Sequence, residues 1–167
     1  HLNTEQETAF AQLKKQVERN QFSEILIFGV TGGGKSELYI RTIKEVLARG
    51  KSAICLVPEI ALTEQLELFF AHHFAKELEI LHSKLTDRGR SQAWLRIRSG
   101  EKKVVLGARS AVFAPVRELG LIILDEEQET SYKQDQTPRY HAREVARWRS
   151  RDSGAVFVMG TATPTLE

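Results

Sequence analysis

The chain has 167 residues, which suits one domain with a sizeable core, and its 41% hydrophobic and 28% charged content excludes a disordered protein. No apolar run approaches the roughly 18 residues that a membrane helix needs, and no signal-peptide pattern opens the chain. Cys55 is the only cysteine, so we expect neither a disulfide nor a thiolate zinc site within the chain. These features predict an intracellular protein.

The net charge of +2 hides an uneven distribution. Residues 1–83 carry 9 Lys and Arg against 11 Asp and Glu, whereas residues 84–117 carry 9 basic residues against only 2 acidic ones. Such a basic block is either a solvated helix face or a surface that attracts a polyanion. Charge alone leaves both interpretations open.

Strands and helices are predicted to alternate along the chain. Thr4 and Glu7 fit a capping box at the start of a first helix. Strands are predicted at residues 24–29, 52–58, 78–82, 102–108, 119–125 and 154–160, and further helices at 35–50, about 63–70, 87–100 and 141–151. Because the strands are continuous apolar runs, the pattern predicts an α/β fold with a mostly parallel sheet covered by helices on both faces. Ligands of such sheets bind at the carboxyl ends of the strands.

A phosphate-binding loop is predicted between the first strand and the helix that follows it. The sequence GVTGGGKS fits the pattern G-x-x-x-x-G-K-[ST] in the context that this pattern requires. Backbone N–H groups can surround phosphate oxygens where residues lack a Cβ, and the helix points its positive end at the phosphates. The predicted nucleotide-binding residues are Gly29, Thr31, Gly32, Gly33, Gly34, Lys35 and Ser36, with Lys35 on the β/γ-phosphates and the Ser36 hydroxyl on Mg²⁺.

Carboxylates occur at the end of a later predicted strand, in the segment LIILDEEQ. This is the place where a P-loop ATPase holds its magnesium, so we assign Asp125 to Mg²⁺ and Glu126 to the base that orients the attacking water. The guanine-reading motif N-K-x-D is missing, since the only asparagines are Asn3 and Asn20, and no L-S-G-G-Q of transporter ATPases is present. A small-molecule kinase is not formally excluded, but no segment resembles its substrate lid. The class of nucleotide enzyme that remains is an ATPase that drives mechanical work.

Six segments, in order, resemble a known family over essentially residues 2–167. They are GVTGGGKSELYI, LVPEIALTEQ, LHSKL, LGARSAVFAPVRELGLIILDEEQETSYKQ, PRYHAREVA and GTATPTLE. They closely resemble the first helicase lobe of the PriA (primosomal protein N′) family, the superfamily 2 DNA helicases that restart replication forks in bacteria. The resemblance implies a RecA-like lobe of a cytoplasmic bacterial helicase that uses ATP and Mg²⁺ and moves 3′ to 5′ on single-stranded DNA. Its implied partners are forked DNA, a second helicase lobe in the same parent chain, primosome proteins and single-stranded-DNA-binding protein.

The resemblance also implies roles for individual residues. Gln6 resembles the glutamine that reads adenine, and Gln128 stands where the family has a histidine that bonds across to the TAT motif. The implied DNA contacts are Pro58, Glu59, Thr63, Arg109 and Ser110, and the implied coupling residues are Thr161, Ala162 and Thr163. An aromatic-rich loop that senses single-stranded DNA would contain Tyr132, Lys133, Arg139, Tyr140, His141 and Arg143. Rings that stack on bases and cations that meet phosphates suit that task without any sequence preference.

Two alternative functions remain open, one in the same class as the PriA-like interpretation and one in a different class. One is another superfamily 2 motor, such as a RecG-like translocase or a restriction-enzyme motor, against which the PRYHAR segment argues. The other is a non-enzymatic module that binds DNA or a partner, against which the intact Lys35, Asp125 and Glu126 argue. The absent start methionine and the TATPTLE ending indicate a single lobe excised from a longer protein, and a lobe alone is expected to hydrolyse ATP poorly.

Overall fold

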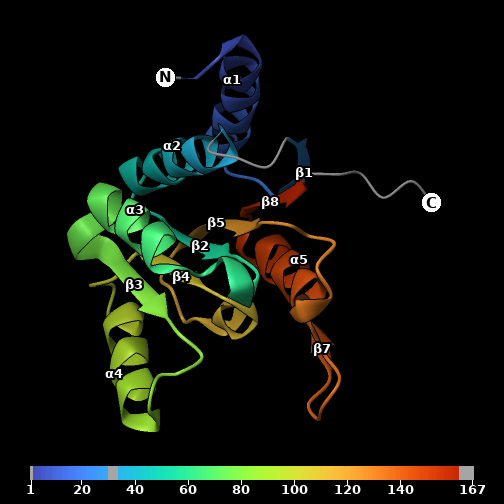
Figure 1. Ribbon diagram of the computed structural model, residues 1–167. Helices are drawn as coiled ribbons and strands as arrows, with labels where there is room; N and C mark the ends of the chain where they lie inside the picture. Colours follow the sequence, from blue (N-terminus) through green and yellow to red (C-terminus); the bar gives the residue numbers. More distant parts are fainter. Residues whose placement is uncertain (1, 30–33, 162–167) are drawn as a thin grey trace.

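A six-stranded parallel sheet forms the centre of the computed structural model, which describes residues 2–29 and 34–161 (Figure 1). Its strands are β1 (Ser23–Phe28), β2 (Ser52–Leu56), β3 (Leu78–Leu81), β4 (Val104–Gly107), β5 (Leu119–Leu124) and β8 (Val156–Thr161). They lie in the order β1-β8-β5-β2-β4-β3, and each neighbouring pair is parallel. The predicted α/β class and parallel sheet are confirmed.

Helices cover both faces of this sheet. The helices α1 (Thr4–Glu18), α2 (Gly34–Ala48) and α3 (Glu64–Phe74) pack on one face, and α4 (Asp87–Arg98) and α5 (Ala142–Ser153) pack on the other. Strand β5 shows why its sequence is a continuous apolar run. Leu121 and Ile123 join the core under α1–α3, whereas Ile122 and Leu124 join the core under α4 and α5. A strand buried on both faces leaves no position for a polar side chain.

Short elements that the apolar pattern did not predict connect the strands. They are the 3₁₀ turns η1 (Glu59–Ala61), η2 (Ala75–Glu77), η3 (Arg109–Phe113) and η4 (Thr130–Tyr132), and a hairpin of β6 (Lys133–Gln134) and β7 (Tyr140–His141). A strand of two residues is too short to show a periodicity of hydrophobic residues. The hairpin extends away from the sheet beyond α5 (Figure 1).

The predicted start of the first helix is corrected by one residue. The N-cap is Asn3, whose side chain accepts a hydrogen bond from the backbone N–H of Gln6, while the Gln6 side chain accepts one from the backbone N–H of Asn3. The capping box is therefore Asn3 with Gln6 rather than Thr4 with Glu7. Asparagine caps a helix slightly better than threonine, which explains the shift.

Strand direction brings distant segments to one edge of the sheet. Gly29, Val57 and Asp125 follow β1, β2 and β5, and Thr161 ends β8. Backbone hydrogen bonds join them at this edge, from Gly29 N to Thr161 O and from Asp125 N to Leu56 O. Each predicted nucleotide-site residue within the described ranges, apart from Gln6 on α1, belongs to or directly follows one of these strands or begins α2. Within residues 2–29 and 34–161, no helix has the length and apolar character needed to cross a membrane.

Candidate nucleotide-binding site and nucleic-acid interface

Lys35 lies against both predicted catalytic carboxylates. Its Nζ is 2.7 Å from Oε1 of Glu126 and 3.3 Å from Oδ1 of Asp125. The side chain is only 8% exposed, so this cation is largely removed from water and its charge is balanced by the two acids. Ninety residues separate Lys35 from Asp125, and the adjacency of the α2 start to the end of β5 brings them together.

A chain of hydrogen bonds continues from Glu126 across the sheet edge. The Gln128 amide nitrogen donates to Oε2 of Glu126 at 2.8 Å, and the Thr161 hydroxyl donates to the Gln128 amide oxygen at 3.0 Å. Glutamine can donate and accept at the same time, which this bridging position requires. The sequence-based expectation that Gln128 bonds across to the TAT motif is confirmed at Thr161. Ala162 and Thr163 lie outside the described residues.

The phosphate-loop glycines that the structure describes are close to other site residues. A Cβ on Gly34 would overlap the side-chain amide of Gln6, and a Cβ on Gly29 would lie 3.1 Å from Cγ of Lys35. Gln6 therefore stands beside the start of α2, although its amide oxygen also caps α1. Thr31, Gly32 and Gly33 lie outside the described residues.

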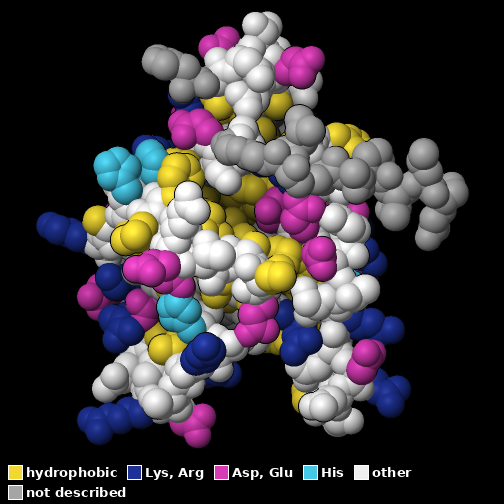
Figure 2. Space-filling view, viewed as in Figure 1, with side chains coloured by type: hydrophobic (Ala, Val, Ile, Leu, Met, Phe, Trp, Pro, Cys, Tyr) yellow, Lys and Arg dark blue, Asp and Glu magenta, His cyan; other side chains and the backbone are white. Residues whose placement is uncertain are grey.

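Ser36 and Asp125, the two predicted magnesium ligands, line the same pocket of about 480 Å³. Its apolar wall includes Val57, Leu66 and Phe69, from the segment after β2 and from α3. Figure 2 shows a hollow with a hydrophobic floor near the middle of the molecule and acidic side chains along its rim. A hydroxyl and a carboxylate are the hard oxygen donors that Mg²⁺ prefers, so the donor set fits this metal.

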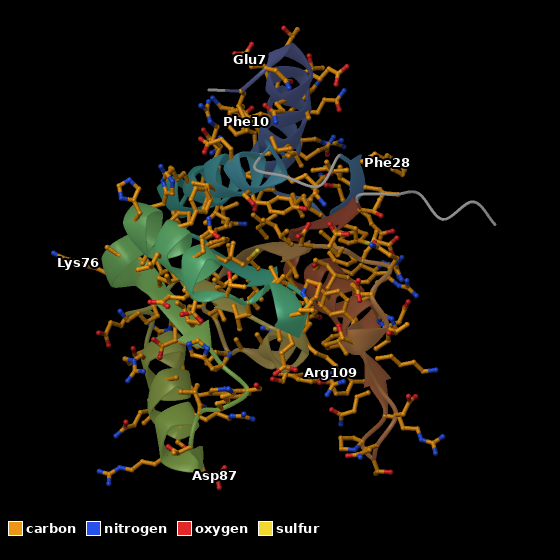
Figure 3. The ribbon with its side chains drawn as sticks, in the orientation of Figure 1. Glu7, Phe10, Phe28, Lys76, Asp87 and Arg109 are labelled. Atoms are coloured by element: carbon orange, nitrogen blue, oxygen red, sulfur yellow. The ribbon has the colours of Figure 1, made fainter. Side chains whose placement is uncertain are left out.

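A second, smaller groove gathers predicted DNA contacts from separate segments. Glu59, Arg109 and Ser110 line a depression of about 160 Å³ together with Ser83 and Ser131. Figure 3 shows Arg109 in the lower part of the molecule, between α4 and the hairpin, both of which extend beyond it. Pro58 is buried behind this surface, and the Thr63 hydroxyl caps α3 by accepting from Leu66 N at 3.2 Å. The structure thus brings together Glu59, Arg109 and Ser110.

Arg109 also holds the loop that follows the carboxylates. Its NH1 donates to the backbone carbonyl oxygens of Ser131 at 3.3 Å and Lys133 at 3.1 Å. These two residues flank Tyr132, so a surface arginine fixes the backbone on either side of a core tyrosine. The family resemblance implied a DNA contact for Arg109 and did not imply this attachment to the loop.

Tyr132 corrects a prediction, because it is fully buried and cannot stack on a DNA base in this structure. Its hydroxyl shares its single proton between the backbone carbonyl oxygens of Leu56 and Asp125. Burial, followed by the charge of Asp125, raises the pKa of this phenol, so it stays protonated and remains a donor. Tyr132 joins the start of the loop to Asp125, the residue that precedes Glu126. Its neighbours in the sequence are polar, so the sequence did not indicate that this tyrosine is buried.

The remaining loop residues are more accessible. Lys133 and Arg139 are exposed, and the half-buried Tyr140 makes an edge-to-face contact with Phe113, with ring centroids 5.0 Å apart. Arg143 pairs with Glu127 at 3.4 Å. Nδ1 of His141 accepts from Arg143 N at 3.1 Å and caps α5, and burial, followed by the charge of Arg143, lowers the pKa of this histidine.

Sequence reasoning missed Tyr39. Its hydroxyl donates to Oδ1 of Asp125 at 2.6 Å, and its side chain is 4% exposed. A signal was present, since Tyr39 follows Ser36 by three residues on a predicted helix and residues at that spacing share a helix face.

The sheet order, the buried lysine between two carboxylates and the bridge from Gln128 to Thr161 together define a nucleotide-binding lobe of the RecA-like class. The model of the DEAD/DEAH box helicase family matches residues 3–167, and the chain belongs to this family. RecG bound to a three-way DNA junction has the same fold, with a TM-score of 0.70 and 20% identity over 98% of this chain and 21% of that one. The Hef helicase domain of Pyrococcus furiosus gives a TM-score of 0.64 at 21% identity, over 97% of this chain and 33% of that one.

Higher sequence identity comes from one group of relatives. The replication restart protein PriA of Bacillus subtilis is 46% identical over 166 residues, which are 99% of this chain and 21% of the relative. PriA of Treponema pallidum is 51% identical over 141 residues, covering 84% of this chain and 22% of the relative. The chain is thus similar to PriA proteins and spans about a fifth of their length.

Proposed function

We propose that this chain is the first motor lobe of an ATP-dependent DNA helicase of the PriA kind, which couples MgATP hydrolysis to 3′ to 5′ movement on single-stranded DNA during replication restart. The observation that carries this proposal is the chain of contacts from Lys35 through Glu126 and Gln128 to Thr161. It joins the phosphate-binding residue, the base and the coupling motif in one network. The 46% identity to Bacillus subtilis PriA supports the same conclusion.

At the nucleotide site each described residue has a distinct task. Lys35 would turn from the carboxylates to the β/γ-phosphates, which compete for the same cation. Ser36 and Asp125 would hold Mg²⁺, which neutralises charge on the phosphates. Glu126, released from Lys35, would accept a proton from the attacking water and orient it. Gln6, beside Gly34, would read the adenine.

The groove around Arg109 supports a route by which DNA could reach the ATP site. A phosphate bound by Arg109 would compete with the carbonyl oxygens of Ser131 and Lys133 for the guanidinium. Tyr132 lies between them and bonds to the carbonyl oxygen of Asp125. Movement of this loop would therefore shift the backbone that carries Asp125 and Glu126. Lys133, Arg139, Tyr140 and Arg143 would extend the contact along the strand.

The first test is Mg²⁺-dependent ATP hydrolysis by the full-length protein, with and without single-stranded DNA. Lys35→Ala serves as the blank because it removes the proposed phosphate-binding cation, and alanine keeps a high helix propensity at this position of α2. We expect hydrolysis that rises strongly with DNA and disappears in the blank. Hydrolysis that is absent, or equal with and without DNA, would instead favour a module that only binds DNA or a partner.

A double-mutant cycle tests the route through the loop. Arg109→Lys keeps the positive charge but removes the paired donors, and Tyr132→Phe removes only the hydroxyl. If both act through the same loop, the loss of DNA stimulation in the double variant will be smaller than the product of the two single losses. Independent losses would show that Arg109 and Tyr132 act separately.

A RecG-like motor is the second candidate, supported by the shared fold at a TM-score of 0.70. The 20% identity to RecG against 46% to Bacillus subtilis PriA favours the PriA-like function. Comparing unwinding of forks that have a free leading-strand end with unwinding of forks that lack one, in the full-length protein, would distinguish substrate preferences of the two kinds of motor.

A further inference from the structure

Asp125 is held at three points in the described part of the chain. Its backbone N–H donates to Leu56 O, its carbonyl oxygen accepts from Tyr132, and Oδ1 accepts from Tyr39 at 2.6 Å. The ion pair with Lys35 also falls on Oδ1, at 3.3 Å. The described contacts therefore concentrate on one carboxylate oxygen and fix the direction in which the other points.

Tyr39 reaches this carboxylate from the same helix face as Ser36. One helical turn separates the two residues, and both line the same pocket as Asp125. The phenol ring packs in the core between α2 and the sheet, and a buried hydroxyl needs a partner. The 2.6 Å hydrogen bond to Oδ1 of Asp125 supplies that partner.

Gly160 leaves the space that this contact occupies. A Cβ built on Gly160 would overlap the Tyr39 hydroxyl and would lie 2.9 Å from Oδ1 of Asp125. The glycine immediately precedes Thr161 of the coupling motif, and its carbonyl oxygen accepts from Glu127 N at 3.0 Å. A larger residue at position 160 would push the tyrosine and the carboxylate apart.

The hydrogen bond from Tyr39 to Asp125 contributes most in the nucleotide-bound state. In the proposed function Lys35 leaves Oδ1 for the phosphates, and the hydrogen bond from Tyr39 then remains to orient the side chain. We propose that Tyr39 is a positioning residue for the magnesium-binding carboxylate, and that Gly160 is the position that permits its contact with Asp125. This inference rests on the proposed function and adds to it two residues that determine how much Mg²⁺ the site requires.

The test separates metal binding from nucleotide binding in the full-length protein. A fluorescent ATP analogue is first bound in the presence of EDTA, and Mg²⁺ is then titrated in a parallel series without chelator. For Tyr39→Phe we expect the metal-free affinity for nucleotide to stay within about twofold of the wild type. The Mg²⁺ concentration for half-maximal binding should rise about tenfold, as for loss of one hydrogen bond to a charged group.

Thr42→Val is the matched control, because it removes another buried hydroxyl from α2, one that donates to the backbone carbonyl oxygen of Leu38 at 2.8 Å rather than to a carboxylate. Its Mg²⁺ requirement should equal that of the wild type. Gly160→Ala keeps the Tyr39 hydroxyl but crowds it, so it should raise the Mg²⁺ requirement too, and it gives the answer if Tyr39→Phe does not fold.

Two results would overturn the inference and are distinguishable. If the wild type needs Mg²⁺ for tight nucleotide binding but neither Tyr39→Phe nor Gly160→Ala changes that need, Tyr39 does not position Asp125 and the proposed function stands. If the wild type binds no nucleotide with or without Mg²⁺, the proposed function fails and the inference fails with it.

Discussion

Gln128 occupies the position in the nucleotide site where a single side chain joins two motifs. It donates to Glu126 and accepts from Thr161, so one amide fixes the Glu126 side chain relative to the end of β8. A side chain at this place must offer a donor on one side and an acceptor on the other. A neutral histidine, the residue that the family resemblance implies at this position, would satisfy the same demand.

Gln128→Ala should therefore uncouple hydrolysis from DNA. We expect DNA-stimulated hydrolysis to fall roughly tenfold, since a bond to an ionised carboxylate is lost, while nucleotide affinity changes little. Gln128→His, which keeps a donor and an acceptor, should retain most of the stimulation. Steady-state hydrolysis at saturating ATP, with and without DNA, makes the comparison, and equal losses in both variants would contradict this role.

Tyr132 and Arg139 should differ in what they contribute, although both belong to the predicted DNA loop. Tyr132→Ala empties a fully buried site and removes two hydrogen bonds, so it should cost about 3–5 kcal/mol of stability. Arg139→Ala, at an exposed position, should change stability by less than about 0.5 kcal/mol and should weaken DNA binding. Denaturant unfolding and DNA-binding titrations check the two effects, and a stable Tyr132→Ala would contradict its assignment to the core.

His141 should make stability depend on pH. Its neutral Nδ1 caps α5, and the pKa of the folded state is lowered from 6.5, chiefly by burial. Because the unfolded chain binds the proton more readily, the cap contributes fully above about pH 6.5, and this contribution is lost as pH falls toward the lower, folded pKa. His141→Asn keeps a capping acceptor that does not titrate. Melting temperatures from about pH 5 to about pH 8 should fall less steeply toward acid in the variant than in the wild type.

At the scale of elements, the carboxyl ends of the strands pack closely against the turns that follow them. Gly107 ends β4, and a Cβ at this position would lie 2.6 Å from Cβ of Ala111 in η3 and 3.1 Å from Leu81 O. Turn η3 carries Arg109, so the close approach of β4 to this turn also places the predicted DNA groove. Gly107 is thus needed both for the close packing of β4 on η3 and for the position of Arg109.

Gly107→Ala should destabilise the protein by about 1–3 kcal/mol, because the added methyl group must displace η3 or the end of β3. Ser110→Ala, at an exposed position of the same turn, should leave stability within about 0.5 kcal/mol of the wild type. Thermal or denaturant unfolding measures both, and Gly107→Ala with wild-type stability would show that the turn moves freely. DNA affinity measured on the same samples would show whether displacement of η3 disturbs the groove.

At the scale of the whole molecule, the proposed catalytic groups lie at one edge of the sheet of a single lobe. Lys35, Asp125 and Glu126 are assembled within this lobe, but a proposed second lobe would supply the arginine that stabilises the transition state. The 167-residue chain alone should therefore bind nucleotide weakly and hydrolyse it at least about 10³-fold more slowly than the full-length protein with DNA. Single-turnover hydrolysis by both proteins tests this, and comparable rates would contradict the division of the site between lobes.

The sequence by itself determined the class of fold, because buried parallel strands must be apolar along their whole length and helices must alternate with them. It also predicted that Lys35, Asp125 and Glu126 belong to one site, since they occur in short motifs at the ends of strands, and the structure places their side chains in contact. Gln128 was implied only by the resemblance to a helicase family, in which a histidine is expected at this position. The predictions of the fold and of the nucleotide site depended on residues adjacent in the sequence or on the order of strands along the chain.

Only the tertiary structure decided the positions that depend on contacts between distant segments. Tyr132 looked like a surface aromatic in a polar loop, yet its ring completes the core beneath β2 and β5. Tyr39 looked like an ordinary helix residue, and Gly160 like the end of an apolar strand, until their approach to Asp125 was visible. Local patterns specify which face of an element is buried, but the partner that a buried polar group finds is set by the packing of elements far apart in the sequence.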